Sequence, residues 1–333
     1  MKAFYQQIGI GPLCGLLGKS RQAFYDHHWR ADQQALDEGL ILDLVHQQRR
    51  ITPGAGGRKL VHLLQKQWQN HGIKMGRDQF FDLLRRHDLL IRRRKKYVIT
   101  TNSKHWLKKH PNRTVGLTVD QAEQLWVSDI TYILAGNRFG YLILITDAYS
   151  RKIVGYEFSE SLSADFCVKA IKQALDERQF PSRRLMHHSD RGLQYCSQAY
   201  VKALEQHNCL ISMTQNGDPY ENALAERVNG ILKQEWKLDR KFDSFNQAKS
   251  AIEQAIYQYN HARPHASCDY LTPMQAHGHT GALKKRWKPM SKNKFVSVFN
   301  INTATRLIGV TFVKPPQDYV FSCKAIAGLS LNL

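Results

Sequence analysis

The spacing of apolar residues divides the chain into a helical first part and a mixed second part. Up to about residue 115, apolar side chains recur every three or four positions in short segments broken by glycine, which is typical of helices. From residue 125 onward, short apolar and aromatic runs bounded by turn residues alternate with helical patterns. The pattern therefore predicts an all-α region followed by an α/β domain.

Two helix-turn-helix patterns are predicted in the first part. Over residues 9–30, an apolar run ends at a glycine, and Ser20 then provides a suitable N-cap for a second helix. Residues 58–70 form an amphipathic segment, which a His-Gly pair separates from a short helix over 78–87. Two short helices joined by a glycine-containing turn place the second helix in the major groove of DNA. Small helical bundles that bind no DNA remain the alternative.

The second part is predicted to form a mixed sheet covered by helices. The expected elements are strands 125–134, 141–146 and 152–158, helix 163–178, strand 184–188, helix 197–207, strand 210–214 and helix 220–236. Tight turns join the first three strands, so these should pair antiparallel. Sites in such sheets form at strand ends and on the adjoining helices. A capping box at Ser244 opens one more helix, and residues 300–333 form either a hairpin or an extension.

The charge of the chain indicates a polyanionic partner. Lys and Arg number 48 against 28 acidic residues, a net charge of +20, of which residues 1–115 carry +14. Each phosphate that such a surface neutralises releases counterions, so DNA is the expected partner. A generally solvated basic surface is the alternative. The candidate DNA-binding residues are Arg21, Arg77, Arg92, Arg93, Arg94, Lys95, Lys96 and Lys233.

Cysteine usage and hydropathy indicate a protein that stays in the cytoplasm, associated with the nucleoid. The six cysteines contain no C-x-x-C pair and are expected to be reduced, packed thiols. No apolar run approaches the ~18 residues of a membrane span. We therefore expect no membrane contact.

Three carboxylates are the candidate catalytic residues. Asp129 interrupts an apolar strand, where an unpaired charge is costly, Asp190 follows another strand, and Glu226 lies on a helix after a glycine- and proline-containing loop. Separate elements that supply three acids can hold two Mg²⁺ ions about 3.5–4 Å apart for displacement at phosphorus. Mg²⁺ prefers oxygen ligands and keeps several waters, so few carboxylates suffice. A salt bridge or a helix cap is the alternative for any one of them.

Other polar residues near these acids have simpler interpretations. Asp147 lies in a turn, whereas Asp218 and Glu221 lie near a helix start, where acids suit the helix dipole. His187 and His188 precede Asp190 and are expected to be packed or surface histidines. Lys233 differs, because Asn222, Glu226, Asn229 and Lys233 share one face of the predicted helix. A cation there suits a DNA phosphate, and a solvated lysine is the alternative.

Five ordered motifs carry a family resemblance. They are W-V-S-D-I-T-Y at 126–132, H-S-D-R-G-L-Q-Y at 188–195, N-G-D-P-Y-E-N-A-L-A-E-R at 216–227, Y-N-H-A-R-P-H at 259–265 and L-T-P at 271–273. With these motifs the chain resembles the second-frame (OrfB) transposases of bacterial insertion sequences. The resemblance implies a ribonuclease-H-like catalytic core shared with retroviral integrases. It also implies that Asp129, Asp190 and Glu226 are both the catalytic and the metal-binding residues, with two Mg²⁺ ions for which Mn²⁺ substitutes.

The function implied is metal-dependent cleavage and strand transfer at the ends of a mobile DNA element. The partners implied are the terminal inverted repeats and target DNA, further copies of the chain, and the product of an upstream overlapping frame. A DNA-binding regulator without catalysis and a ribonuclease-H-type nuclease without joining are the alternatives. The zinc site of retroviral integrases is not expected, because Cys14 is the only cysteine in the first 166 residues.

The predicted organisation has three regions. Residues 1–115 form the helix-turn-helix region with a basic linker, residues 116–280 form the integrase-type core, and residues 281–333 form a basic segment and tail. Arg263 and His265 belong to a motif, and a bond that ties one helix to the core is the role expected for them.

Overall fold

The computed structural model describes residues 9–91, 106–215 and 222–284. The chain forms two compact units, Met1–Trp287 and Lys288–Leu333, and the second lies outside the described residues. Within the described ranges, every helix is too short or too polar to cross a bilayer.

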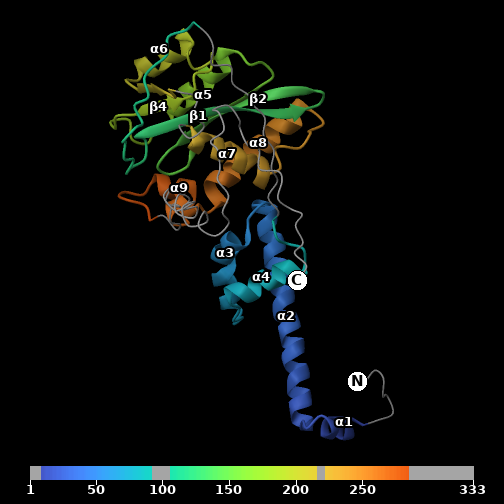
Figure 1. Ribbon diagram of the computed structural model, residues 1–333. Helices are drawn as coiled ribbons and strands as arrows, with labels where there is room; N and C mark the ends of the chain where they lie inside the picture. The colour runs from blue at the N-terminus through green and yellow to red at the C-terminus, as the bar shows by residue number, and fades with distance from the viewer. Residues whose placement is uncertain (1–8, 92–105, 216–221, 285–333) are drawn as a thin grey trace, which may run out of the picture. The chain divides into compact units, whose positions relative to one another are not determined.

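A five-stranded sheet with the order β3-β2-β1-β4-β5 forms the centre of the second part (Figure 1). Its strands are β1 (Leu125–Ala135), β2 (Arg138–Asp147), β3 (Ile153–Ser159), β4 (Met186–Ser189) and β5 (Leu210–Met213). The first three strands pair antiparallel, as predicted, whereas β4 runs parallel to β1 and β5 runs parallel to β4. The central strand β1 therefore has one antiparallel and one parallel neighbour.

Helices cover both faces of this sheet (Figure 1). They are α5 (Ala164–Asp176) and α6 (Gln198–Gln206) over one face, and α7 (Ala223–Glu235) and α8 (Phe245–Ala262) over the other. Successive residues of a strand face opposite sides of a sheet. Accordingly, Ile143 and Ile145 of β2 pack with α5 and α6, whereas Leu142 and Leu144 pack with α7 and α8. This two-sided burial explains why β2 is apolar without alternation.

The first part of the chain is helical, as predicted. It contains α1 (Ile10–Leu16), α2 (Arg21–Ile51), α3 (Gly57–Asn70) and α4 (Arg77–Arg86). Ile41 and Val45, near the end of α2, pack with buried residues of α3 and α4 in a separate core. The first half of α2 makes fewer such contacts, and its Trp29 and Leu36 are exposed.

The chain after α8 continues through a short 3-10 helix, η1 (Ala266–Cys268), and α9 (Pro273–His277). Thr272 and Gln275 form a capping box that fixes the start of α9. Only one of the two hydrogen bonds of the predicted capping box at Ser244 is present. Ser244 accepts a hydrogen bond from the Gln247 backbone, but the Gln247 side chain accepts one from the Asp243 backbone N–H.

One predicted boundary differs substantially from the structure. The second helix of the first helix-turn-helix pattern was expected to end at residue 30, but α2 has 31 residues and ends at Ile51. The predicted division at 115/116 and 280/281 stays a prediction. The expected tail hairpin and the basic run 92–96 lie outside the described residues.

Candidate active site

The three candidate acids lie on elements that meet at one end of the parallel strand pair. In the pairing of β1 with β4, Val127 lies opposite His188. Asp129 lies two residues after Val127, and Asp190 lies two residues after His188. Both acids therefore lie at the carboxyl end of the segment over which β1 and β4 are paired. Glu226 lies in the first turn of α7, which packs against β1.

The pKa values show that the three carboxylates are within electrostatic range of one another. Burial raises the pKa of Asp129 to about 7, with further increases from the charges of Asp190 and Glu226. Burial and the charge of Asp190 also raise the pKa of Glu226. A carboxylate beside like charges prefers to keep its proton. A hydrogen bond from Asn229 opposes this increase at Asp129 but does not cancel it.

Two asparagines of α7 hold this helix against β1. Asn222 Nδ2 donates to the Ser128 backbone oxygen at 3.0 Å, and Asn229 Nδ2 donates to Asp129 Oδ2 at 2.9 Å. Asn222 and Asn229 of the predicted helix face therefore contact β1, whereas Glu226 of the same face is exposed. The bond from Asn229 fixes Oδ2 of Asp129. Asp190 Oδ1 is oriented by the Gly192 N–H, which donates to it at 2.9 Å.

Lys233 lies two turns beyond Glu226 on the same helix face. Burial lowers the pKa of its ammonium, while the charges of Asp129 and Asp239 oppose that change. The ammonium of Lys233 is therefore within electrostatic range of Asp129, which agrees with the prediction that Lys233 shares a helix face with Glu226. Its position is compatible with a phosphate bound beside the acids.

The donor chemistry of the cluster fits a divalent metal ion. Carboxylate oxygens are the ligands preferred by Mg²⁺, and the mutual repulsion at Asp129 is what a bound cation would relieve. Within the described residues, no group of three or more His, Cys, Asp or Glu side chains lies close enough together to hold a metal ion. Metal binding by Asp129, Asp190 and Glu226 therefore stays a prediction.

The two histidines before Asp190 are buried, as expected. Ser128 Oγ and Tyr200 OH lie 2.7 and 3.0 Å from His187 Nε2, and burial lowers the pKa of His187 to about 3. His188 Nδ1 lies 2.9 Å from Ser212 Oγ. Both are therefore packing residues beneath the carboxyl end of β4.

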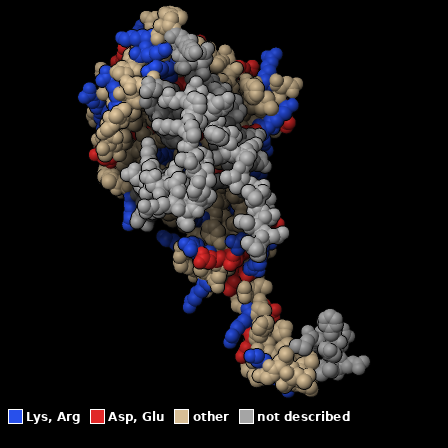
Figure 2. All heavy atoms as spheres, in the orientation of Figure 1, with Lys and Arg blue, Asp and Glu red and all other residues tan. Residues whose placement is uncertain are grey.

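Apart from Lys233, the predicted DNA-binding residues lie outside this cluster or outside the described residues. Arg21 is exposed at the start of α2, and Arg77 is exposed at the start of α4, where its Nε lies 2.9 Å from Asp78 Oδ1. Residues 92–96 lie outside the described ranges, as do the rival acids Asp218 and Glu221. On the face shown in Figure 2, Lys and Arg side chains form separate groups rather than one continuous patch.

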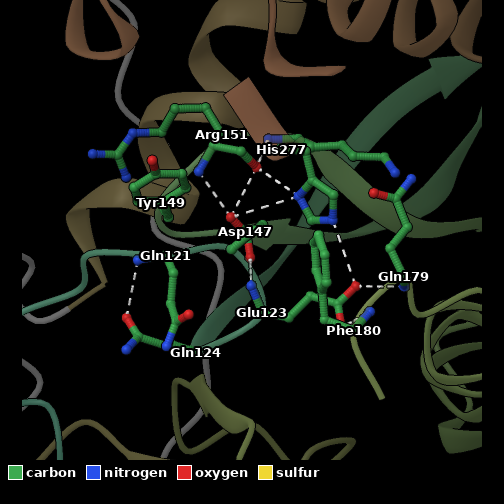
Figure 3. Close-up of polar contacts among 12 residues, drawn as sticks. Gln121, Glu123, Gln124, Asp147, Tyr149, Arg151, Gln179, Phe180 and His277 are labelled. Carbon is green, nitrogen blue, oxygen red and sulfur yellow. Dashed lines mark hydrogen bonds and ion pairs between the residues drawn. The ribbon is translucent and has the colours of Figure 1, made fainter. Parts of the chain in front are cut away.

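Asp147, the third rival acid, belongs to a buried polar network (Figure 3). Its Oδ1 accepts hydrogen bonds from the Ser150 N–H and Oγ–H, both at 2.8 Å, which is the predicted turn role. Its Oδ2 also accepts from the Glu123 backbone at 2.7 Å. Ser150 Oγ lies 3.0 Å from Nδ1 of the buried His277. Asp147 is fully buried here, away from the three candidate acids.

Glu123 is the centre of the same network and was not singled out from the sequence. The Glu123 carboxylate accepts hydrogen bonds from Arg178 Nε at 2.9 Å and from the Gln179 backbone N–H at 2.7 Å. His277 Nε2 lies 3.5 Å from Glu123 Oε1. Burial opposes its charge, but these hydrogen bonds lower its pKa to about 2. The network connects the start of β1, the end of α5 and the end of α9. Its role is structural.

A second buried ion pair explains Arg263 of the Y-N-H-A-R-P-H motif. Arg263 donates from Nε and Nη2 to both oxygens of Glu235, each at 2.8 Å, and Lys59 Nζ lies 2.7 Å from Glu235 Oε1. Glu235 is the last residue of α7. The bidentate pair therefore ties the end of α8 to α7, the bond expected for this motif.

Comparisons with known proteins found related sequences. Models of the integrase core domain match residues 119–219 and 207–273. The chain is 33% identical over 267 residues to a 31 kDa protein of the insertion element IS600 from Shigella sonnei, covering 78% of this chain and 96% of that protein. It is 32% identical to the transposase of the insertion sequence IS629 from Shigella sonnei, covering 68% and 77%.

Solved structures with a similar chain path include two viral integrases. The catalytic core domain of HTLV-2 integrase in complex with magnesium aligns with a TM-score of 0.38 at 19% identity, covering 47% of this chain and 97% of that one. A simian T-cell lymphotropic virus intasome chain aligns with a TM-score of 0.42 at 20% identity, covering 72% and 81%.

Proposed function

Because the chain belongs to the insertion-sequence transposases that carry an integrase core domain, we propose that Asp129, Asp190 and Glu226 are the carboxylates with which it cleaves and joins DNA. The predicted α/β core of the ribonuclease-H-like class, preceded by an all-α region, is confirmed. The observation that carries the residue assignment is electrostatic. Asp129 is a half-buried acid whose pKa is raised by desolvation and by the charges of the two other acids of the set.

The three acids fit two Mg²⁺ ions, for which Mn²⁺ would substitute. Asp129 would contribute to both ions, with Asp190 and Glu226 completing the sites. Bound divalent ions would polarise the scissile phosphodiester and stabilise charge on the attacking and leaving oxygens. Asn229 would keep Asp129 Oδ2 in place, and the proton that Asp129 holds below about pH 7 would have to leave.

DNA would be held by residues outside the acid cluster. Lys233 would contact a phosphate beside Asp129, because the charge of Asp129 acts on the Lys233 ammonium. Arg21, Arg77 and the run 92–96 remain our candidates for binding the terminal repeats. Assembly of several copies on DNA, and a contribution from an upstream overlapping frame, remain predictions from the family.

Amide substitutions at the acids test this assignment. Asp129→Asn, Asp190→Asn and Glu226→Gln keep the side-chain shape but remove the charge that attracts Mg²⁺. We expect each to abolish cleavage and strand transfer on an oligonucleotide that carries the element's end, while duplex binding persists. Lys233→Ala should instead weaken duplex binding and leave some cleavage at high protein concentration.

The control is Asp176→Asn, an exposed acid on α5. It should cleave like the wild type. Wild-type-like cleavage by Glu226→Gln would refute the assignment. Wild-type protein that binds the duplex but never cleaves it would indicate a DNA-binding regulator.

A further inference from the structure

Three buried side-chain nitrogens close to one another have no hydrogen-bond acceptor among the described residues. They are Nη1 of Arg151, Nη1 of Arg263 and Nε2 of His265. Arg151 follows the turn after β2, whereas Arg263 and His265 follow α8. Polar atoms that folding removes from water are normally hydrogen-bonded, so three unpartnered atoms in neighbouring residues indicate a ligand that binds there.

Hydrogen bonds and ring contacts connect these three residues. Arg151 Nε donates to Ser267 Oγ at 3.4 Å, and Ser267 Oγ lies 2.8 Å from His265 Nδ1. Tyr259 joins the group, because its hydroxyl donates to the Arg151 backbone oxygen at 3.0 Å and the Arg263 guanidinium lies 5.6 Å from its ring centroid. In Figure 3 the Arg151 side chain extends away from Asp147 and His277, so it does not serve their network.

Burial makes the His265 ring neutral, because it lowers the pKa of His265 well below its usual value and the charges of Arg263 and Arg151 lower it further. Ser267 Oγ lies within hydrogen-bond distance of both Arg151 Nε and His265 Nδ1, so its hydroxyl either donates to Nδ1 or accepts from it. A neutral imidazole carries its hydrogen on one ring nitrogen, so His265 Nε2 is a donor in one tautomer and an acceptor in the other. The Nη1 atoms of Arg151 and Arg263 are N–H donors in either case.

The charge around these donors is positive. Arg263, Arg151, Lys59 and Arg227 all act on His265. Of these cations, Arg263 and Lys59 share the single carboxylate of Glu235. Arg263 uses Nε and Nη2 for that bond, which leaves Nη1 for another acceptor. The cluster reaches from the 3%-exposed Arg263 to the half-buried Arg151 and His265.

We propose that Arg151, Arg263 and His265 form a binding site for a phosphate group. A tetrahedral oxyanion offers several acceptor oxygens and one or two negative charges, which match the N–H donors of Arg151 and Arg263, a hydrogen on Nε2 in one tautomer of His265, and an excess of cations. The phosphate is either a backbone phosphate of DNA, an alternative that rests on the proposed function, or free inorganic phosphate. The site is built from elements other than those that carry Asp129, Asp190 and Glu226.

The test compares Arg151→Gln and His265→Asn with the wild type in the full chain. Lys249→Gln, which removes an exposed cation from α8, is the matched control. Binding of inorganic phosphate is measured by calorimetry at constant ionic strength. Binding of a duplex oligonucleotide is measured by fluorescence anisotropy over a series of salt concentrations. Circular dichroism in phosphate-free buffer reports whether each variant is folded.

The two sources of phosphate give different results. For a DNA phosphate, both variants weaken duplex binding about tenfold relative to Lys249→Gln, inorganic phosphate competes with the duplex, and Arg151→Gln lowers the slope of log affinity against log salt by about 0.9. For free phosphate, both variants weaken phosphate binding about tenfold, and their duplex affinity equals that of Lys249→Gln.

The proposal is overturned when both variants match Lys249→Gln in both assays. It is also overturned when the wild type shows no saturable binding of either ligand, whatever the variants do. Failure of the proposed function is recognised separately, because Asp129→Asn would then cleave DNA like the wild type. That outcome leaves the phosphate and duplex titrations unaffected.

Discussion

At the scale of single residues, Asp129 is an acid that its surroundings keep protonated to an unusually high pH. Its pKa of about 7 means that the folded protein holds a proton there across a pH range in which the unfolded chain does not. Stability of the metal-free protein should therefore fall as pH rises from about 4 to about 7. Mg²⁺ binding would displace this proton.

We predict that Mg²⁺ affinity falls about tenfold for each pH unit below 7, because one proton competes with the ion. Calorimetry in two buffers of different ionisation enthalpy would detect about one released proton at pH 6. Asp129→Asn should stabilise the metal-free protein at pH 8 and have little effect at pH 4. A Mg²⁺ affinity independent of pH between 5 and 7 would contradict this assignment.

Glu123 is the opposite case, a buried acid kept charged by its partners. Its pKa of about 2 lies below the unfolded value, so its contribution to stability is complete above about pH 4.5 and is lost as pH falls toward 2. We predict that Glu123→Gln lowers the free energy of unfolding at pH 7 by about 3 kcal/mol, the lower range for breaking a buried ion pair.

Chemical denaturation at pH 7 and pH 3 would measure this difference, which should shrink at the lower pH. Asp82→Asn is the matched control, because Asp82 pairs with Arg85 on the exposed side of α4. That exposed pair should contribute at most about 1 kcal/mol. Equal effects of the two substitutions would show that the Glu123 network adds no special stability.

At the scale of single elements, α7 joins chemistry to packing. Asn229 bonds to Asp129, while the next residue, Gly230, has open space where the Cβ of a larger residue would lie. We predict that Asn229→Ala lowers cleavage about 10- to 100-fold, as removal of a residue that orients a metal ligand does, with the fold retained. Gly230→Ala should leave cleavage unchanged and stabilise the protein by about 0.5–1 kcal/mol. Single-turnover cleavage and thermal melting of both variants would separate positioning from helix stability.

The sequence predicts most elements of the core because their patterns are local. Each strand of the sheet overlaps its predicted range, since runs such as residues 141–146 are apolar whichever partner they pack against. The end of α2 was missed for a physical reason. Gly39 costs a helix only about 1 kcal/mol, and packing of Ile41 and Val45 against α3 and α4 retains the later turns. That packing depends on residues far along the chain.

The residues of the candidate site also fall into those that local patterns predict and those that they do not. Asp129, Asp190 and Glu226 could be chosen because each stands in a recognisable motif and local element. The Glu123 network and the donors of Arg151, Arg263 and His265 could not, because each contact joins segments that only the folded chain brings together. The R-P-H motif could be recognised in the sequence, but the pairing of its Arg263 with Glu235 could not be predicted.

At the scale of the whole molecule, positive charge should govern affinity for DNA. We predict that replacing residues 92–96 by glutamine lowers the slope of log affinity against log salt by up to about 4.5, or about 0.9 for each phosphate that is no longer neutralised. Anisotropy titrations of a terminal-repeat duplex from low to moderate salt would measure this slope. Neutralising two exposed cations of the core, Arg240 and Lys249, is the comparison. An unchanged slope would mean that the basic run does not contact phosphates.

The length of α2 has a consequence that is best expressed in base pairs. Its 31 residues span about 46 Å, because each residue adds about 1.5 Å along a helix. The two predicted helix-turn-helix patterns lie at its two ends. A straight duplex touched at both ends of α2 would meet the protein at points about 14 base pairs apart, at about 3.4 Å per base pair. Because that distance exceeds one helical turn, we predict that α2 sets the spacing between two stretches of a terminal repeat when both patterns bind the duplex.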